Sequence, residues 1–153
     1  MNAGYIYYAF PNTTYLSTSE VYASACFGGL LSPTLSVNYD VDEANGFYAG
    51  ISAGYTCSTP WSKAKPTNLN LYGKLSASSA GYNKFWFGVD KTALSDLYVS
   101  ASMPFNIGDS ASITPSLSYS MIINNDLRDA LSNFAAPLDS NNFVGAVTVS
   151  YGF

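Results

Sequence analysis

The sequence predicts an all-β fold, a single domain over residues 1–153 that forms an antiparallel up-and-down β-barrel of about eight strands. Apolar and small polar residues alternate with a period of two in segment after segment. Only 10% of residues are charged, against about 25% in ordinary globular proteins. Aromatic residues, 16% of the chain, gather towards the ends of the alternating segments.

Each alternating segment is expected to form one strand. In order, they are residues 4–10, 20–27, 34–41, 47–55, 69–76, 97–105, 113–123 and 142–153. The first two alternate less cleanly, and Tyr48 in the fourth is an aromatic residue on the polar side. The last is the clearest, because Phe143, Val147 and Val149 share one face while Thr148 falls on the other. The length of many segments is close to that of a tilted strand that crosses a bilayer, about 9–11 residues.

Successive connections of an up-and-down sheet alternate between its two ends. The long connections 11–19, 81–94 and 124–141 fall at one end, together with the Asn45-Gly46 hairpin, and the short turns 28–33 and 106–110 fall at the other. The connection 57–67 is long but lands with the short turns, so either a strand is missed, for instance over 84–89, or this turn is unusual. Residues 126–134 form either a short helix capped by Asp126 or an irregular loop.

Composition excludes several classes of function. The net charge is −4 and the six basic residues are scattered, which argues against nucleic-acid binding. The chain has no histidine, so Ser-His-Asp and Cys-His catalysis are excluded, and no enzymatic activity is expected. We expect no cofactor. No apolar run of 18 residues predicts a membrane-spanning helix, and no signal peptide begins at Met1; such a signal is expected to have been removed or to lie upstream.

Three features favour a barrel in a bacterial outer membrane over a soluble sandwich. The face opposite the apolar one carries Ser, Thr, Gly and Asn, where a water-facing sheet normally carries Lys and Glu. Aromatic residues near strand ends are typical of the girdles at the two membrane interfaces. The chain ends on an aromatic residue after an alternating strand. Short turns at one end and long loops at the other also fit this class.

A final strand ending in Phe resembles the sorting signal of outer-membrane barrels, with Tyr151 and Phe153 at its third-from-last and last positions. The chain also resembles the TorF-type porin family of Gram-negative bacteria, through GYIYYAFP at 4–11, EVYA at 20–23, LLSPTL at 30–35, YDVDEANG at 39–46 and NFVG at 142–145. The resemblance implies a barrel and passive transport, and no catalytic residues. Members of that family carry further strands before these stretches, so the chain is either the last part of a larger barrel or a compact relative.

The polar-face charges Glu20, Asp40 and Lys74 are expected to project into the lumen, where they either tune ion selectivity or pair across a filled interior. Asp40, Asp42 and Glu43 form the only acidic cluster and are weak candidates for a calcium site. The EF-hand spacing fails there, so a solvated hairpin tip is the favoured interpretation and no metal is expected.

Cys26 and Cys57 are expected to be unpaired. The predicted topology puts them on strands separated by a third strand and on opposite faces of the sheet. Strands that are next-but-one neighbours lie roughly 10 Å apart, which exceeds the Cα separation of a disulfide.

The leading functional hypothesis is a structural or narrow, non-specific porin-like barrel whose partners are the lipid bilayer and the barrel-insertion machinery. The sequence is compatible with a monomer and with a homo-oligomer. One alternative is surface binding or adhesion through the loop aromatics, for which Phe85, Trp86, Phe87 and Phe134 are the candidate anchors. Another is a secreted β-protein that self-assembles through its apolar face.

Overall fold

The computed structural model describes residues 1–12, 16–59, 67–134 and 138–152. The strands are β1 (Asn2–Tyr8), β2 (Thr18–Cys26), β3 (Thr34–Asp40), β4 (Gly46–Thr59), β5 (Thr67–Ser78), β6 (Ala93–Ser102), β7 (Phe105–Ile107), β8 (Ala111–Ile122) and β9 (Asn141–Tyr151). Two eight-residue helices, α1 (Ala80–Phe87) and α2 (Asn125–Ser132), interrupt them. The prediction of an all-β, antiparallel, up-and-down fold is therefore confirmed.

In the described part of the chain, all nine strands belong to one sheet in the order β1-β2-β3-β4-β5-β6-β8, with β7 and β9 also paired to β8. β6 and β7 share one edge of β8, which gives eight rows of strands. The break between β6 and β7 falls at Met103 and Pro104. Met103 lies opposite Pro115 of β8, and neither proline has an N–H to donate to a ladder. Every row matches one predicted segment.

The sheet is open, which corrects the expectation of a closed barrel. Among the described residues β1 pairs only with β2, and β9 pairs only with β8. All residues of β9 are exposed, on both faces, because no element covers this edge. The alternation that identifies strands contains no information on whether the first and last strands of a sheet meet, and this is why the sequence could not decide closure.

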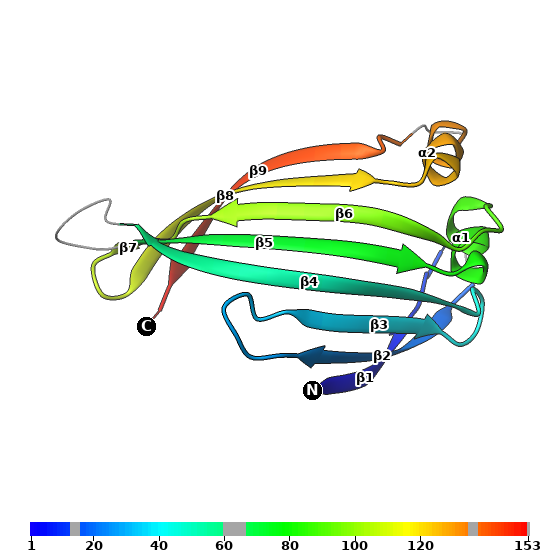
Figure 1. Ribbon diagram of the computed structural model, residues 1–153, viewed down its shortest axis with the longest axis horizontal. Coiled ribbons are helices and arrows are strands. Elements are labelled where there is room, and N and C mark those ends of the chain that lie inside the picture. The colour runs from blue at the N-terminus through cyan, green and yellow to red at the C-terminus, as the bar shows by residue number, and fades with distance from the viewer. Residues whose placement is uncertain (13–15, 60–66, 135–137, 153) are drawn as a thin grey trace.

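The sheet is curved (Figure 1). Because directly paired residues share a face, the register places Glu20, Asp40, Tyr48 and Lys74 on the same side of β2, β3, β4 and β5. Side chains of β1, β2, β3 and β6 all lie close enough to Tyr82 of α1 to act on its charge, which requires the strands to curve around it. We call this side the inner face and the opposite side the outer face.

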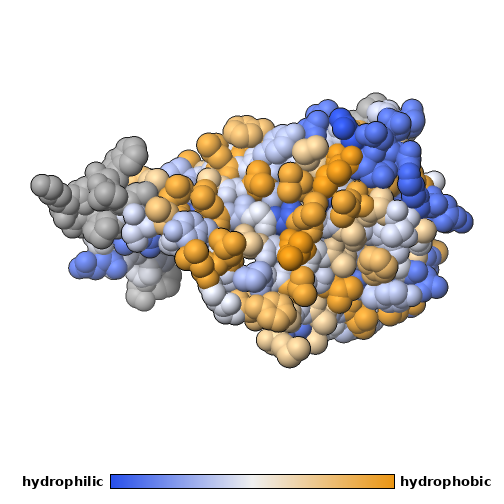
Figure 2. All heavy atoms as spheres, in the orientation of Figure 1, coloured by the Kyte–Doolittle hydropathy of each residue, from blue (hydrophilic) through white to orange (hydrophobic). Residues whose placement is uncertain are grey.

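Burial is reversed relative to a soluble β-protein. Of the residues that the structure describes, only Ala44, Leu127 and Leu131 are buried apolar side chains, and none of them lies in a strand. The buried strand residues are polar: Thr18, Ser19, Glu20, Asp40, Thr67, Ser76, Ser78 and Ser95. Thr67 begins β5 at the end of the sheet away from the helices, and the others face inwards or lie near the helix end. Outer-face residues are exposed, for example Ile51 at 50% and Leu117 at 54%. Figure 2 shows apolar side chains across the strands and hydrophilic ones at the end that carries the helices.

The two ends of the sheet differ as predicted. Both helices and the 41–45 hairpin lie at one end, while the turns at 27–33 and 108–110 lie at the other (Figure 1). The connection predicted over 57–67 is shorter than expected, because β4 extends to Thr59 and β5 begins at Thr67. Residues 60–66 lie outside the described residues. A strand over 84–89 is wrong, since this segment contains the end of α1. Neither helix in the described chain is long and apolar enough to cross a membrane.

Candidate functional site

The centre of the inner face is the hydroxyl of Tyr48. It donates to the carboxylate of Asp96, 2.9 Å from Oδ1 and 3.0 Å from Oδ2, and a 2.8 Å hydrogen bond joins it to the hydroxyl of Ser76. The ammonium of Lys74 donates to the same hydroxyl at 3.4 Å and lies 4.7 Å from the centre of the Tyr48 ring, within cation–π range. One phenol thus links a cation and an anion from two further strands.

A β-bulge aims Asp96 at this centre. Between the pairs Leu75–Leu97 and Ala77–Leu94, two residues of β6 oppose the single residue Ser76 of β5. The bulge turns Ser95 and Asp96 to the same side, where the Ser95 hydroxyl donates to Asp96 Oδ1 at 3.0 Å. Ser95 and Asp96 are two successive polar residues at the bulge, so the clear alternation begins only at residue 97. Asp96 was therefore missed, although it is in phase with Tyr98 on the inner face.

Glu20 and Asp40 lie opposite each other on β2 and β3. Like charges in this position destabilise a sheet unless donors compensate them. Asp40 Oδ2 accepts from the Thr18 hydroxyl at 2.6 Å, and Glu20 Oε2 accepts from the Tyr8 hydroxyl at 3.3 Å and from Asn38 Nδ2 at 3.1 Å. Each buried carboxylate therefore has its own set of donors.

The acidic cluster around the hairpin has a structural role for its first member. Asp40 Oδ1 accepts from the backbone N–H groups of Asp42 at 3.0 Å and Ala44 at 3.1 Å, which holds the turn before Asn45. The side chains of Asp42 and Glu43 are in solvent. In the part of the chain that is described, no group of three or more acidic, Cys or His side chains is placed to hold a metal ion.

Helix α1 closes over the end of the inner face. Ser79 caps it: its hydroxyl accepts from the Tyr82 N–H at 3.4 Å and from the Phe47 N–H of β4 at 2.9 Å. Gly46 and Gly81 make the close approach possible, because a Cβ at Gly46 would lie 2.3 Å from the Tyr82 nitrogen and one at Gly81 would lie 2.8 Å from two carbonyl oxygens of the hairpin.

The Tyr82 ring contacts the Tyr48 ring, with centroids 5.7 Å apart. Burial raises the pKa of Tyr82 to about 12, and the acidic groups of Glu20, Tyr8, Asp96 and Asp40 act in the same direction. The Tyr82 phenol is therefore neutral over the whole physiological range.

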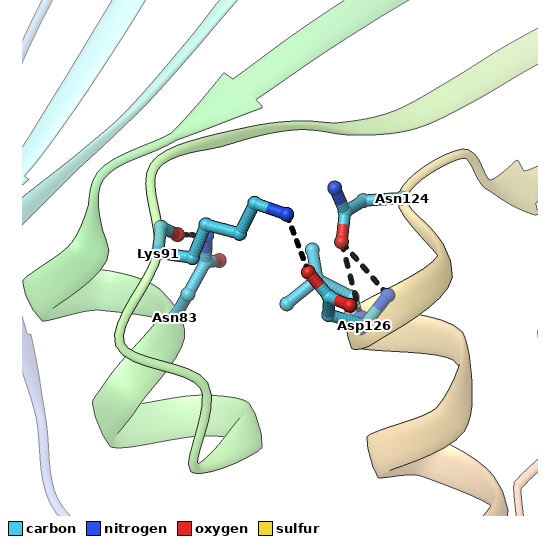
Figure 3. A network of polar contacts seen from close by, with 5 residues as sticks. Asn83, Lys91, Asn124 and Asp126 are labelled. Atoms are coloured by element: carbon cyan, nitrogen blue, oxygen red, sulfur yellow. Dashed lines mark hydrogen bonds and ion pairs between the residues drawn. The ribbon is translucent and has the colours of Figure 1, made fainter.

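A polar network joins α1 to α2 (Figure 3). The fully buried amide of Asn83 accepts from the Ser78 hydroxyl at 2.6 Å and donates to the carbonyl oxygen of Lys91 at 2.6 Å. The Lys91 ammonium forms an exposed ion pair with Asp126 at 2.5 Å. Asn124, not Asp126, caps α2, since its Oδ1 accepts from the N–H groups of Asp126 and Leu127. Of the two alternatives for 126–134, the helix is correct, but it spans Asn125–Ser132 and its cap lies two residues before the predicted Asp126.

The predicted loop aromatics belong to this end of the molecule. Phe85 and Trp86 lie on α1 with ring centroids 5.0 Å apart, edge to face, and Trp86 also contacts Tyr82. Trp86 is 37% exposed and Phe134, just after α2, is 38% exposed. Phe87, the last residue of α1, is half-buried and turns towards the inner face.

The two cysteines are free, as predicted. Of the two predicted sorting-signal residues, Tyr151 is the last residue of β9 and is 69% exposed. Phe153 lies outside the described residues.

The inner face and the two helices line a cleft of about 700 Å³ that is open to solvent. Its floor is formed by Tyr48, Lys74, Asp96, Tyr98 and Ser120, and α1, α2 and the segment before β9 form its other walls. The cleft brings a predicted inner-face charge, Lys74, together with a predicted loop aromatic, Phe87.

No protein-family model matches this chain, and no curated protein or solved structure shows a significant match to it.

Proposed function

We propose that this sheet forms part of the wall of a transmembrane β-barrel in a bacterial outer membrane. The protein acts there as a structural protein or a narrow, non-specific porin-like channel, without catalysis. The reversed burial carries the proposal. A soluble monomer rarely exposes a contiguous apolar patch larger than a few hundred Å². Here the outer-face residues of successive strands are exposed, including Val21, Val37, Ile51, Leu71, Val99, Leu117 and Val147. Lipid is the solvent in which that surface is stable.

The dimensions of the strands support the same proposal. β4, β5, β6, β8 and β9 have 14, 12, 10, 12 and 11 residues, against the about 9–11 needed to cross a bilayer at a tilt. Because the eight rows alternate in direction, β1 and β9 run antiparallel, so they have the relative direction that closure of a barrel requires. Unpaired edges are costly in lipid, and this favours closure on itself or insertion among further strands.

The test compares two lysine substitutions at neighbouring positions of β6. Val99→Lys puts an ammonium on the outer face, where Val99 is 41% exposed, while Ser100→Lys puts it on the inner face. At mid-membrane, a lipid-facing Lys costs about 2–4 kcal/mol. We expect Val99→Lys to lower the yield of folded protein in lipid vesicles and Ser100→Lys to change it little.

A soluble β-protein would behave in the opposite manner. The outer-face lysine would then raise solubility, and the unmodified chain would be monodisperse without detergent; either result would overturn the membrane proposal. Conductance in planar bilayers separates the two roles, since steps at defined voltages require the channel and their absence at all voltages leaves the structural role.

A further inference from the structure

The cleft under the helices has the size and lining of a small-molecule site. Its volume of about 700 Å³ falls within the range of roughly 300–1,000 Å³ that is usual for ligand pockets. Its floor is strand-borne and polar, whereas Phe87, Leu131 and Leu138 form an apolar wall on the opposite side. An amphipathic lining of this kind selects a ligand that has both apolar and hydrogen-bonding surfaces.

The charges of the floor offset each other. Lys74 and Asp96 are both hydrogen-bonded to the Tyr48 hydroxyl, so the cation and the carboxylate are held on either side of one phenol. Asp139 adds a carboxylate at the exposed rim. A site with a compensated floor gives little net attraction to an anion, and the rim carboxylate opposes one. A neutral ligand avoids both penalties.

The groups left for a ligand are neutral. Among the described residues, the Tyr98 hydroxyl, the Ser120 hydroxyl and the Asn142 amide make no hydrogen bond, although all three line the cleft. Hydroxyl groups both donate and accept, and an amide offers one acceptor and two donors. Ligand hydroxyls can pair with each of them. The Tyr98 ring, held edge-on against Tyr72 at 6.0 Å, is fixed beside these groups.

We propose that this cleft binds a neutral, polyhydroxylated solute of mono- or disaccharide size. Its hydroxyl groups bond to Tyr98, Ser120 and Asn142, and its apolar C–H surface packs on the wall that contains Phe87. The proposal goes beyond a channel or structural role, because binding requires neither conductance nor closure of the sheet.

The test is saturation-transfer NMR on the full-length protein in detergent, with maltose as the neutral probe. Sodium glucuronate and glucosamine hydrochloride serve as charged sugar probes. We expect saturable binding of maltose that is unchanged between low and high salt. Tyr98→Phe removes one hydroxyl and keeps the ring, so we expect it to weaken maltose binding by roughly 3- to 10-fold. Tyr72→Phe is the matched control, since Tyr72 contacts the Tyr98 ring but does not line the cleft.

Absence of saturable maltose binding by a folded protein overturns the proposal, as does tighter, salt-sensitive binding of glucuronate or glucosamine. Equal losses in Tyr98→Phe and Tyr72→Phe overturn the assignment of the site. These outcomes are independent of the membrane proposal, because a chain that is soluble without detergent can be titrated in the same way.

Discussion

The hydroxyl of Tyr48 and the carboxylate of Asp96, 48 positions apart in the chain, are hydrogen-bonded at 2.9 Å across the intervening strand β5. The contact spans two strand spacings on the concave side of the sheet. A phenol is long enough to bridge this gap, and the bulge at Ser95 and Asp96 supplies the acceptor. The curl of the sheet and the position of the bulge are therefore coupled through one side-chain contact.

Tyr48→Phe tests the strength of this coupling. The substitution leaves Asp96, Ser76 and Lys74 without their common partner, and a hydrogen bond to a charged group contributes about 1.5–3 kcal/mol. We expect the free energy of unfolding to fall by about 1–3 kcal/mol in urea titrations of the detergent-solubilised protein. Tyr55→Phe, on the outer face of the same strand, is the control. Equal losses in the two variants would mean that the hydroxyl of Tyr48 adds nothing specific.

Asp40→Ala should loosen the hairpin that follows β3. It removes the acceptor of the Thr18 hydroxyl and of two backbone N–H groups at a site that is 1% exposed. Unsatisfied buried donors cost about 1–3 kcal/mol each. We expect a loss of at least about 2 kcal/mol in unfolding free energy and faster amide exchange at Asp42 and Ala44. Asp42→Ala, in solvent, should leave both quantities nearly unchanged; a similar effect of the two substitutions would contradict the turn-holding role.

The eight strand rows could be predicted because they depend on local alternation. Which connections lie at the same end of the sheet could also be predicted, because this follows from the strand order and the turn residues. Tyr48 was correctly placed on the polar side by the same alternation. Asp96 was not found, because the successive polar residues Ser95 and Asp96 interrupt the alternation, so that the predicted strand starts at residue 97. Closure was wrongly expected because it depends on contact between the first and last strands, which no local pattern encodes.

Helix α1 shows a different kind of failure. Its sequence AGYNKFWF is rich in aromatic residues that favour strands, and this composition allows a strand over 84–89 as one prediction. The signals for a helix were nevertheless present at its boundaries. Ser79 is a favourable N-cap, and Gly88 adopts the left-handed conformation, φ 73°, that commonly ends a helix. Tertiary packing against Gly46 then outweighs the weak helix propensity.

Asn83→Ala should detach the segment after α1. The amide is fully buried and joins Ser78 to the carbonyl of Lys91, so its loss leaves a hydroxyl and a carbonyl without partners. We expect a loss of about 2–4 kcal/mol, together with faster amide exchange in residues 88–92. Lys84→Ala on the same helix removes an ion pair whose two side chains are 67% and 66% exposed, so it should have little effect. The reverse ranking of the two variants would show that the exposed ion pair, and not the buried amide, holds this segment.

Stability should decline in alkaline solution through Tyr82. Its pKa is 10.0 when the chain is unfolded and about 12 when it is folded, so the folded state holds a proton that the unfolded state has lost between these values. The unfolded state then binds fewer protons, and the free energy of unfolding falls as pH rises from 10 towards 12. Below pH 10 the Tyr82 phenol is protonated in the folded and in the unfolded state, so none of this stability is lost. Tyr82→Phe keeps the ring contacts with Tyr48 and Trp86 but cannot ionise, so urea titrations should show a shallower alkaline decline and an unchanged neutral value. An alkaline decline as steep as that of the unmodified protein would assign the effect to other groups.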